Sequence, residues 1–207
     1  MATYTEVGIC NLALSRIGHL KPIASLSEAT QAAVACSLHY APSRDFVLRD
    51  FPWPFARGFA LLTLVETFDE SDPEHTQWAH SYRLPTGVLA IRRFLSATGK
   101  SDTDPPPFEI GSDSTGRLVY ANVEPDEAYV ETTRAITDTA LFDDSFAAAL
   151  SWHLALQVAP SVASAEKARE ALNGYMLATG AAQRTASVES RVERLHAGDF
   201  LRSRGGD

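Results

Sequence analysis

Hydrophobic residues recur at helical spacing in the N-terminal part of the chain. Residues 4–17 carry an apolar stripe at intervals of three and four, and Thr5 is the predicted N-cap. A second stripe runs from about residue 28 to residue 50 behind Ser27, another residue type that caps helices. Pro42 lies within this stripe and lacks the N–H that a helix interior uses, so we expect a kink or a short break there.

The pattern changes between residues 57 and 136. Short runs rich in β-branched and aromatic residues alternate with clusters of Gly, Pro, Asp and Ser, as expected for strands joined by turns. This segment is therefore predicted to be a small, mostly antiparallel β module. Its predicted strands are RGFALLTLV, YRLP, GVLAIRRFL, FEIG, RLVYA and AYVETTRAI.

Helical spacing then returns and continues toward the C-terminus. Asp143 opens an apolar stripe with four-residue spacing, which we expect to end at Pro160. Ser164 is the predicted cap of a further helix over about residues 165–182. Residues 184–207 mix Arg and Gly with weak amphipathicity, which is typical of a tail that is poorly ordered alone.

Together these patterns predict an α+β protein. Residues 1–56 and 143–183 would form one bundle of about four helices, with residues 57–136 inserted as the β module and residues 184–207 as a C-terminal tail. The division rests on the hydrophobic period, which changes from about 3.6 residues to about 2 and back again.

The stretch RDFVLRDFPWPFA marks the passage from helix to β module. Pro52 and Pro54 cannot continue a helix, and each biases the residue before it toward extended geometry. Phe51, Trp53 and Phe55 alternate with these prolines, so three large rings leave the helix on a stiff extended segment. We expect the rings to pack at the junction of bundle and module or against a neighbouring subunit; packing within the subunit's own core alone is the alternative.

The net charge of the chain makes some functions improbable. The net charge of −8 argues against a general binder of nucleic acid or of anionic membranes, because both need basic surfaces. Residues 58–150 contain 16 of the 26 acidic residues and 6 of the 18 basic ones, so the β module is the acidic part. No apolar run approaches the roughly 20 residues of a membrane span, and no secretory signal precedes the first helix, which predicts a cytoplasmic site of synthesis and no membrane.

Residue types that carry chemistry are scattered along the chain. Cys10 and Cys36 lie within apolar helical patterns and are predicted to be buried free thiols. The six histidines fall at no metal-ligand spacing, and the sequence contains no phosphate-binding loop or nucleophile motif. Adjacent carboxylates such as Asp143 and Asp144 do not face each other on a helix, so helix capping explains them better than catalysis. The sequence predicts no enzyme, no cofactor and no metal site.

Three stretches of the chain carry a family resemblance. The first is ICNLALSRIGHLKPIASLSE with the helix ending RDFVLRDFPWPFA, the second is YRLPTGVLAIRRF, and the third is ITDTALFDDSFAAALSWHLALQVAP followed by DFLRSR. Together they resemble the tail tubular protein A family of short-tailed phages and the related head-to-tail adaptors, or connectors, of tailed phages and phage-like particles. The resemblance covers residues 8 to 204 and consists of patterns of apolar and aromatic residues.

The resemblance implies a structural virion protein at the head–tail junction, made in the host cytoplasm. Its bundle and β insertion would assemble as a homo-oligomeric ring of about twelve copies, below the portal protein and above the next tail or nozzle protein. Genome DNA would pass through the lumen without specific binding, because an electronegative wall repels phosphate. The candidate portal-docking residues lie in the tail and are Arg191, Arg194, Phe200, Leu201, Arg202 and Arg204.

Two functions of other classes stay open at this point. One is an enzyme that acts on a small ligand or a glycan through a cleft between bundle and insert, for which the sequence offers only scattered carboxylates. The other is a soluble regulatory protein that binds another cytoplasmic protein through its aromatic patch.

Overall fold

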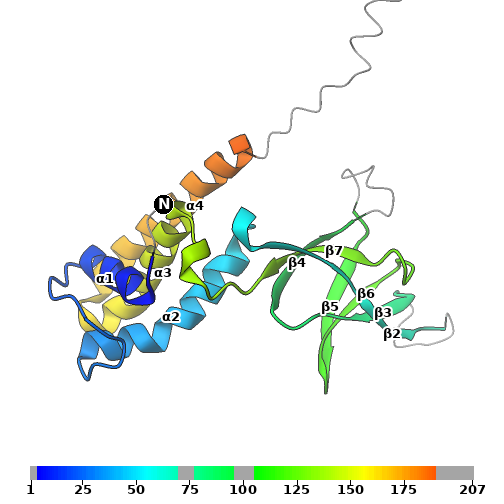
Figure 1. The fold of residues 1–207 in the computed structure, drawn as a ribbon, viewed down its shortest axis with the longest axis horizontal. Helices are drawn as coiled ribbons and strands as arrows, with labels where there is room; N and C mark the ends of the chain where they lie inside the picture. Colours follow the sequence, from blue (N-terminus) through cyan, green and yellow to red (C-terminus); the bar gives the residue numbers. More distant parts are fainter. Residues whose placement is uncertain (1–3, 70–76, 96–104, 190–207) are drawn as a thin grey trace, which may run out of the picture.

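The molecule is elongated, with helices at one end and strands at the other (Figure 1). The computed structural model describes residues 4–69, 77–95 and 105–189. The described residues form four α-helices and seven β-strands, and the fold is α+β as predicted. The helices are α1 (Glu6–Arg16), α2 (Gln31–Asp50), α3 (Asp144–Val162) and α4 (Ala165–Glu189), with two short 3₁₀ turns, η1 (Pro54–Ala56) and η2 (Thr139–Leu141).

Helix α3 is the centre of the helical bundle, and it packs against α1, α2 and α4. Asp143 caps its start by accepting a 2.6 Å hydrogen bond from the Phe146 N–H. The predicted stripe of α3 is fully buried, and both Cys10 and Cys36 are buried free thiols in the same core, which confirms those two predictions. The stripe consists of Phe146, Leu150, Leu154 and Val158.

The start of α2 differs from its prediction. Thr30, not Ser27, is the N-cap, because the Thr30 hydroxyl accepts a hydrogen bond from the Ala33 N–H. Ser27 belongs to a preceding turn that the Glu28 carboxylate holds by accepting from two backbone N–H groups. Of the kink or short break expected at Pro42, the break is absent, since α2 is continuous from Gln31 to Asp50. Pro42 lies on the exposed side of the helix, where water can satisfy the carbonyl that its missing N–H leaves free.

Both C-terminal helices extend beyond their predicted ends. Pro160 lies inside the last turn of α3, which continues to Val162. Ser164 caps α4 as predicted, by accepting from the Lys167 N–H at 3.2 Å. Helix α4 continues to Glu189, so residues 184–189, predicted to be tail, are helical. The alanines around Gly180 have high helix propensity, and together they outweigh the unfavourable propensity of one glycine.

The β module consists of two antiparallel sheets. The first has the strand order β1-β7-β4 and the second has the order β2-β3-β6-β5. The predicted strand RGFALLTLV divides at buried Leu62, where the chain leaves the first sheet and enters the second. The strands are β1 (Arg57–Leu61), β2 (Thr63–Thr67), β3 (His80–Arg83), β4 (Val88–Phe94), β5 (Phe108–Asp113), β6 (Gly116–Ala121) and β7 (Tyr129–Arg134).

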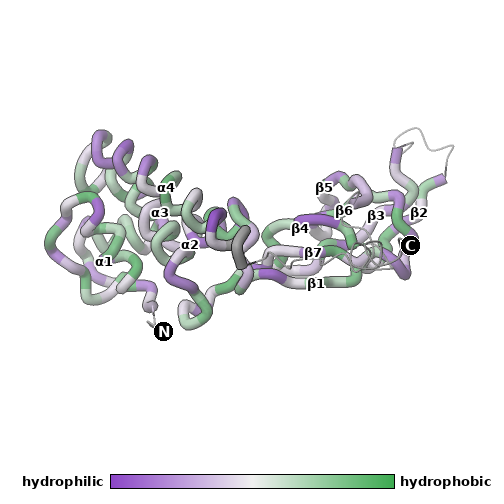
Figure 2. Tube along the Cα trace, turned by 90° about the horizontal axis from the view of Figure 1, so that it is seen from above, coloured by the Kyte–Doolittle hydropathy of each residue, from purple (hydrophilic) through white to green (hydrophobic). Residues whose placement is uncertain are grey.

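The bundle and the module lie at opposite ends of the long axis, and the chain crosses between them twice (Figure 2). The outward crossing runs from α2 through η1 into β1, and the return crossing runs from β7 through η2 into α3. Each part has its own hydrophobic core. The positions of the two halves therefore depend on the contacts made at this junction.

Candidate functional site

The end of α2 lacks the backbone donors that usually complete a helix C-terminus. The last carbonyls of a helix need partners beyond the helix, but Pro52 and Pro54 have no N–H to offer. The indole Nε1 of Trp53 donates a 2.7 Å hydrogen bond to one of these carbonyls, Val47 O. The predicted helix stop thus has a side-chain cap that comes from the extended segment itself.

Arg92 of β4 donates hydrogen bonds to the backbone carbonyls that follow Val47 at the end of α2. Its Nη2 donates to Leu48 O at 3.2 Å, to Arg49 O at 2.8 Å and to Phe51 O at 3.1 Å. Its Nε donates a 2.7 Å hydrogen bond to the Thr133 hydroxyl on β7. One guanidinium thus joins the end of α2 to two strands of the β module, and its positive charge suits the negative end of the helix dipole. Burial lowers the pKa of Arg92.

The three predicted rings lie together at this junction. Phe51 is buried, Trp53 is 2% exposed and Phe55 is half-buried. Trp53 and Phe55 both meet the ring of Phe146 on α3 edge to face, at centroid distances of 5.2 Å and 5.1 Å. The rings are therefore covered by the chain's own bundle where it meets the module, and Trp53 keeps almost no surface for a neighbouring subunit.

A second arginine cluster lies on the first sheet beside the junction. Glu131 of β7 is buried, and its carboxylate accepts from Arg57 Nε at 2.6 Å and from Arg93 Nε at 2.8 Å. Arg57 and Arg93 come from the strands on either side of β7. A register shift between Ile91 and Arg93 makes Arg92 an extra residue in β4, so two consecutive arginines serve two different contacts.

The bundle has its own polar contact near the end of α2. The Tyr175 hydroxyl of α4 donates a 2.6 Å hydrogen bond to the Asp50 carboxylate. Phe46 stacks on the His153 ring at 4.4 Å, and the buried His153 Nδ1 atom has no hydrogen-bond partner among the residues that the structure describes. A hollow of about 280 Å³ opens beside Phe46, Arg49 and Asp50. Its one carboxylate, Asp50, already accepts the hydrogen bond from Tyr175.

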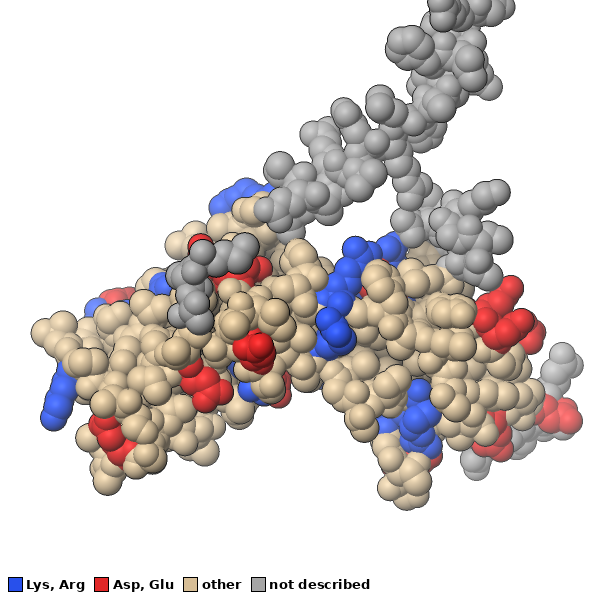
Figure 3. Space-filling model, in the orientation of Figure 1, with Lys and Arg blue, Asp and Glu red and all other residues tan. Residues whose placement is uncertain are grey.

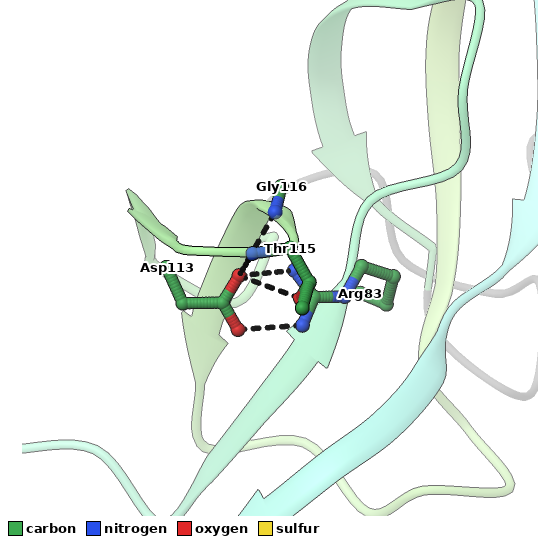
Figure 4. A network of polar contacts seen from close by, with 4 residues as sticks. All are labelled: Arg83, Asp113, Thr115 and Gly116. Carbon is green, nitrogen blue, oxygen red and sulfur yellow. Dashed lines mark hydrogen bonds and ion pairs between the residues drawn. The ribbon is translucent and has the colours of Figure 1, made fainter.

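A further polar network lies in the β5–β6 hairpin (Figure 4). Both carboxylate oxygens of Asp113 pair with the Arg83 guanidinium, at 2.8 Å and 2.6 Å. The same carboxylate accepts from the Thr115 hydroxyl and from the N–H groups of Thr115 and Gly116. Gly116 has a φ of +148°, which an L side chain rarely adopts. The network fixes the turn, and the Arg83 guanidinium holds the pKa of Asp113 well below its usual range.

Sequence reasoning identified the aromatic segment but missed Arg92 and Glu131. Both residues sit in strands, where alternation predicts only an inward or an outward direction and no specific partner. The candidate docking residues of the tail lie outside the described residues; they are Arg191, Arg194, Phe200, Leu201, Arg202 and Arg204.

Among residues 4–69, 77–95 and 105–189, no group of three or more His, Cys, Asp or Glu side chains is placed to hold a metal ion. In the same residues, no helix combines the length and the apolar character needed to cross a bilayer. Comparison of the sequence with protein-family models and with curated proteins finds no match.

Proposed function

We propose that this protein is a subunit of a head-to-tail adaptor ring in a tailed phage or phage-like particle. The observation that carries the proposal is the junction, where Trp53 and Arg92 together hold the end of α2. A connecting subunit must keep a fixed geometry between the part that contacts one neighbour and the part that contacts another. Side-chain contacts to backbone carbonyls from both sides of a crossing supply that rigidity.

Surface composition supports an assembly role. Several apolar side chains on the outer sides of α2 and α4 face solvent, including Leu38 at 67% exposure, Met176 and Leu177. Burial of such side chains against neighbouring subunits would stabilise a ring. The acidic balance of the chain suits a passage for DNA, because a wall rich in carboxylates repels phosphate and does not retain it.

In this proposal the bundle and the β module meet different partners, namely neighbouring copies, the portal protein and the next tail or nozzle protein. The resemblance of the aromatic and apolar stretches to tail tubular proteins supports the same assignment. Identical subunits build a channel by closing into a cyclic assembly, and the resemblance implies about twelve copies in this ring.

Negative-stain electron microscopy of the purified protein, alone and mixed with the portal protein of the same phage, tests the proposal. We expect closed rings with a central channel, at least in the presence of the portal. Single particles without rings in both samples, from protein that is folded by circular dichroism, would overturn it.

A further inference from the structure

Two cysteines lie side by side in the core of the helical bundle. Cys10 of α1 and Cys36 of α2 are both 0% exposed, and they belong to the same cluster of buried residues. Their thiol groups share a hydrogen bond, in which the S–H of Cys10 donates to the sulfur of Cys36. The sequence contains no other cysteine, so a disulfide within this chain can form only between these two.

Small side chains around the two thiols allow α1 and α2 to approach closely. Ala13 lies one turn after Cys10 and Ala33 one turn before Cys36, and both alanines are 0% exposed. The two helices come within 8 Å of each other, measured between Cα atoms. A disulfide needs neighbouring backbones and sulfur atoms that point toward each other, with a final S–S distance of about 2.05 Å. The hydrogen-bonded thiols already point toward each other, so a small shift of α1 toward α2 can close the bond.

The hydrogen bond also makes the two thiols chemically unequal. It lowers the pKa of Cys36, because the Cys10 S–H stabilises the Cys36 thiolate, whereas burial acts in the opposite direction. The same hydrogen bond raises the pKa of Cys10, and burial raises it further. Since the thiolate is the nucleophile in disulfide exchange, Cys36 is the thiol that attacks first and Cys10 is the one that follows.

We propose that Cys10 and Cys36 are a redox-active pair that closes to a disulfide between α1 and α2, with a low-molecular-weight disulfide as the oxidant. In the first step Cys36 loses its proton and attacks one sulfur of the small disulfide, whose S–S bond breaks and releases one thiolate. In the second step Cys10 loses its proton and attacks the Cys36 sulfur, which releases the second small thiolate. The two protons complete the two released thiols. Two S–H bonds of the protein are thus lost, one S–S bond forms, and the oxidant is reduced.

The oxidant reaches these buried thiols only when the contact between α1 and α2 opens. Residues 17–30, which join the two helices, contain no helix or strand, so α1 can separate from α2 while both helices stay intact. Acidic and basic side chains both lie over the helical end of the molecule (Figure 3). This surface therefore does not repel anionic glutathione as a surface of one negative sign would. Because opening must come first, disulfide formation in the folded protein is slow.

The disulfide would make the stability of the bundle depend on its redox environment. It closes a loop of about 25 residues, and such a restraint on the unfolded chain typically raises the ratio of folded to unfolded protein by about 100-fold. A reducing cytoplasm keeps a pair of this kind as thiols, whereas an oxidising environment outside a cell favours the disulfide. The cross-link belongs to the fold of one subunit, so it does not depend on ring assembly or on the adaptor function.

Incubation of the purified wild-type protein with oxidised glutathione tests the proposal. We expect the intact mass to fall by two hydrogen atoms. Trypsin cleaves after Arg16, so a digest without reductant should contain one cross-linked pair of peptides that joins Cys10 to Cys36. The melting temperature should rise by about 5–10 °C, and dithiothreitol should reverse the rise. An unchanged mass at equilibrium, a stable glutathione adduct in place of the disulfide, or a disulfide between two chains would overturn the proposal.

The same reaction in urea shows whether the fold brings the thiols together. In a glutathione redox buffer, the equilibrium constant for disulfide formation should be about 100-fold larger for the folded protein than for the protein unfolded in urea. An equilibrium constant that is no larger for the folded protein would show that the native bundle holds the thiols apart, and it would overturn the proposal.

Acid quenching tests the order of attack. Wild-type protein quenched early in the reaction should carry glutathione on Cys36, and glutathione on Cys10 instead would overturn the assigned order. Cys10→Ala removes the second thiol, so this variant should stop at the adduct on Cys36 and show no cross-linked peptides. If Cys10→Ala does not fold, the quenched wild-type protein decides the order.

Discussion

Trp53 Nε1 donates a 2.7 Å hydrogen bond to the carbonyl oxygen of Val47, six residues earlier in the chain. The bond makes the extended segment after α2 the cap of the helix that it leaves. It also buries the indole against Phe51 and Phe146, whose rings meet it edge to face. Replacement of this side chain should therefore remove both a cap and a central part of the core.

Trp53→Ala should lower the free energy of unfolding by about 3–5 kcal/mol, the usual cost of truncating a buried Trp. Urea denaturation followed by far-ultraviolet circular dichroism measures the loss. Phe59→Ala removes a ring that is largely exposed and serves as the control, with an expected change within about 0.5 kcal/mol. Equal stability of the two variants would contradict the packing role of Trp53.

Arg92→Met roughly keeps the length of the side chain but removes the three hydrogen bonds that Arg92 donates to Leu48 O, Arg49 O and Phe51 O. We expect a loss of about 1.5–3 kcal/mol in unfolding free energy, because the donor is charged and two of its three hydrogen bonds to α2 and Phe51 are partly buried. Small-angle scattering should also show a wider range of orientations between bundle and module. Arg169→Met, at an exposed position of α4, is the matched control. If the scattering curve of Arg92→Met is identical to that of Arg169→Met, Arg92 does not hold the bundle and the module together.

His153 should make stability depend on pH. Burial lowers the pKa of His153, so the unfolded chain, with its ordinary value of about 6.5, binds the proton more tightly than the folded chain does. The contribution of the neutral ring is thus fully present above about pH 6.5 and is lost as the pH falls below it. Denaturation at a series of pH values should show a smaller acid loss for His153→Leu than for the wild type. The same acid loss in both proteins would exclude His153 as the cause, and His39→Leu is the control.

Asp113 should keep its charge at unusually low pH. A carboxyl-carbon NMR titration should place its pKa below the ordinary value of about 3.9, because Arg83 and the turn hydrogen-bond the charged form. Arg83→Gln should raise this pKa toward the ordinary value. Arg117→Gln on the neighbouring strand removes an arginine that bonds to the carbonyls of Val88 and Leu89, and it should leave Asp113 unchanged. A normal pKa in the wild type would show that the ion pair does not persist in solution.

Deletion of residues 190–207 should separate folding from docking. The deletion is placed after Glu189 because α4 continues to that residue. We expect the shortened protein to keep its melting temperature but to lose binding to the portal, since the deleted residues include the candidate docking arginines, Phe200 and Leu201. Co-sedimentation with the portal measures the binding. Undiminished binding would remove the tail from the proposed portal contact.

The sequence predicts the fold correctly wherever residues that are close together in the chain determine the structure. The stripe of α3 and the caps Thr5, Asp143 and Ser164 follow rules that involve only residues near in the chain. Helix ends were less predictable: α3 continues past Pro160, where its apolar stripe was expected to end, and α4 continues past residue 182 to Glu189. The apolar stripe also does not predict how far each side chain of α2 is buried, because Cys36 is buried whereas Leu38 is 67% exposed.

The sequence predicts where the junction lies, but it does not predict which residues make the contacts there. Pro52 and Pro54 predict a stop, and the alternating rings predict burial nearby. The partner of the helix end is Arg92, which lies more than forty residues away and is brought there by strand pairing. Nothing in the local sequence distinguishes Arg92 from Arg93, although one holds α2 and the other holds Glu131.

The register shift in β4 affects how the protein tolerates insertions, deletions and substitutions in that strand. Arg92 reaches α2 because β4 has one residue more than β7 between Ile91 and Arg93. Removal of that one residue would remove this register shift and leave acceptable strand residues, yet the end of α2 would lose its partner. The mutual orientation of the two halves is thus encoded in the length of a strand as well as in its residue types. Insertions and deletions in β4 should be far less tolerated than substitutions there.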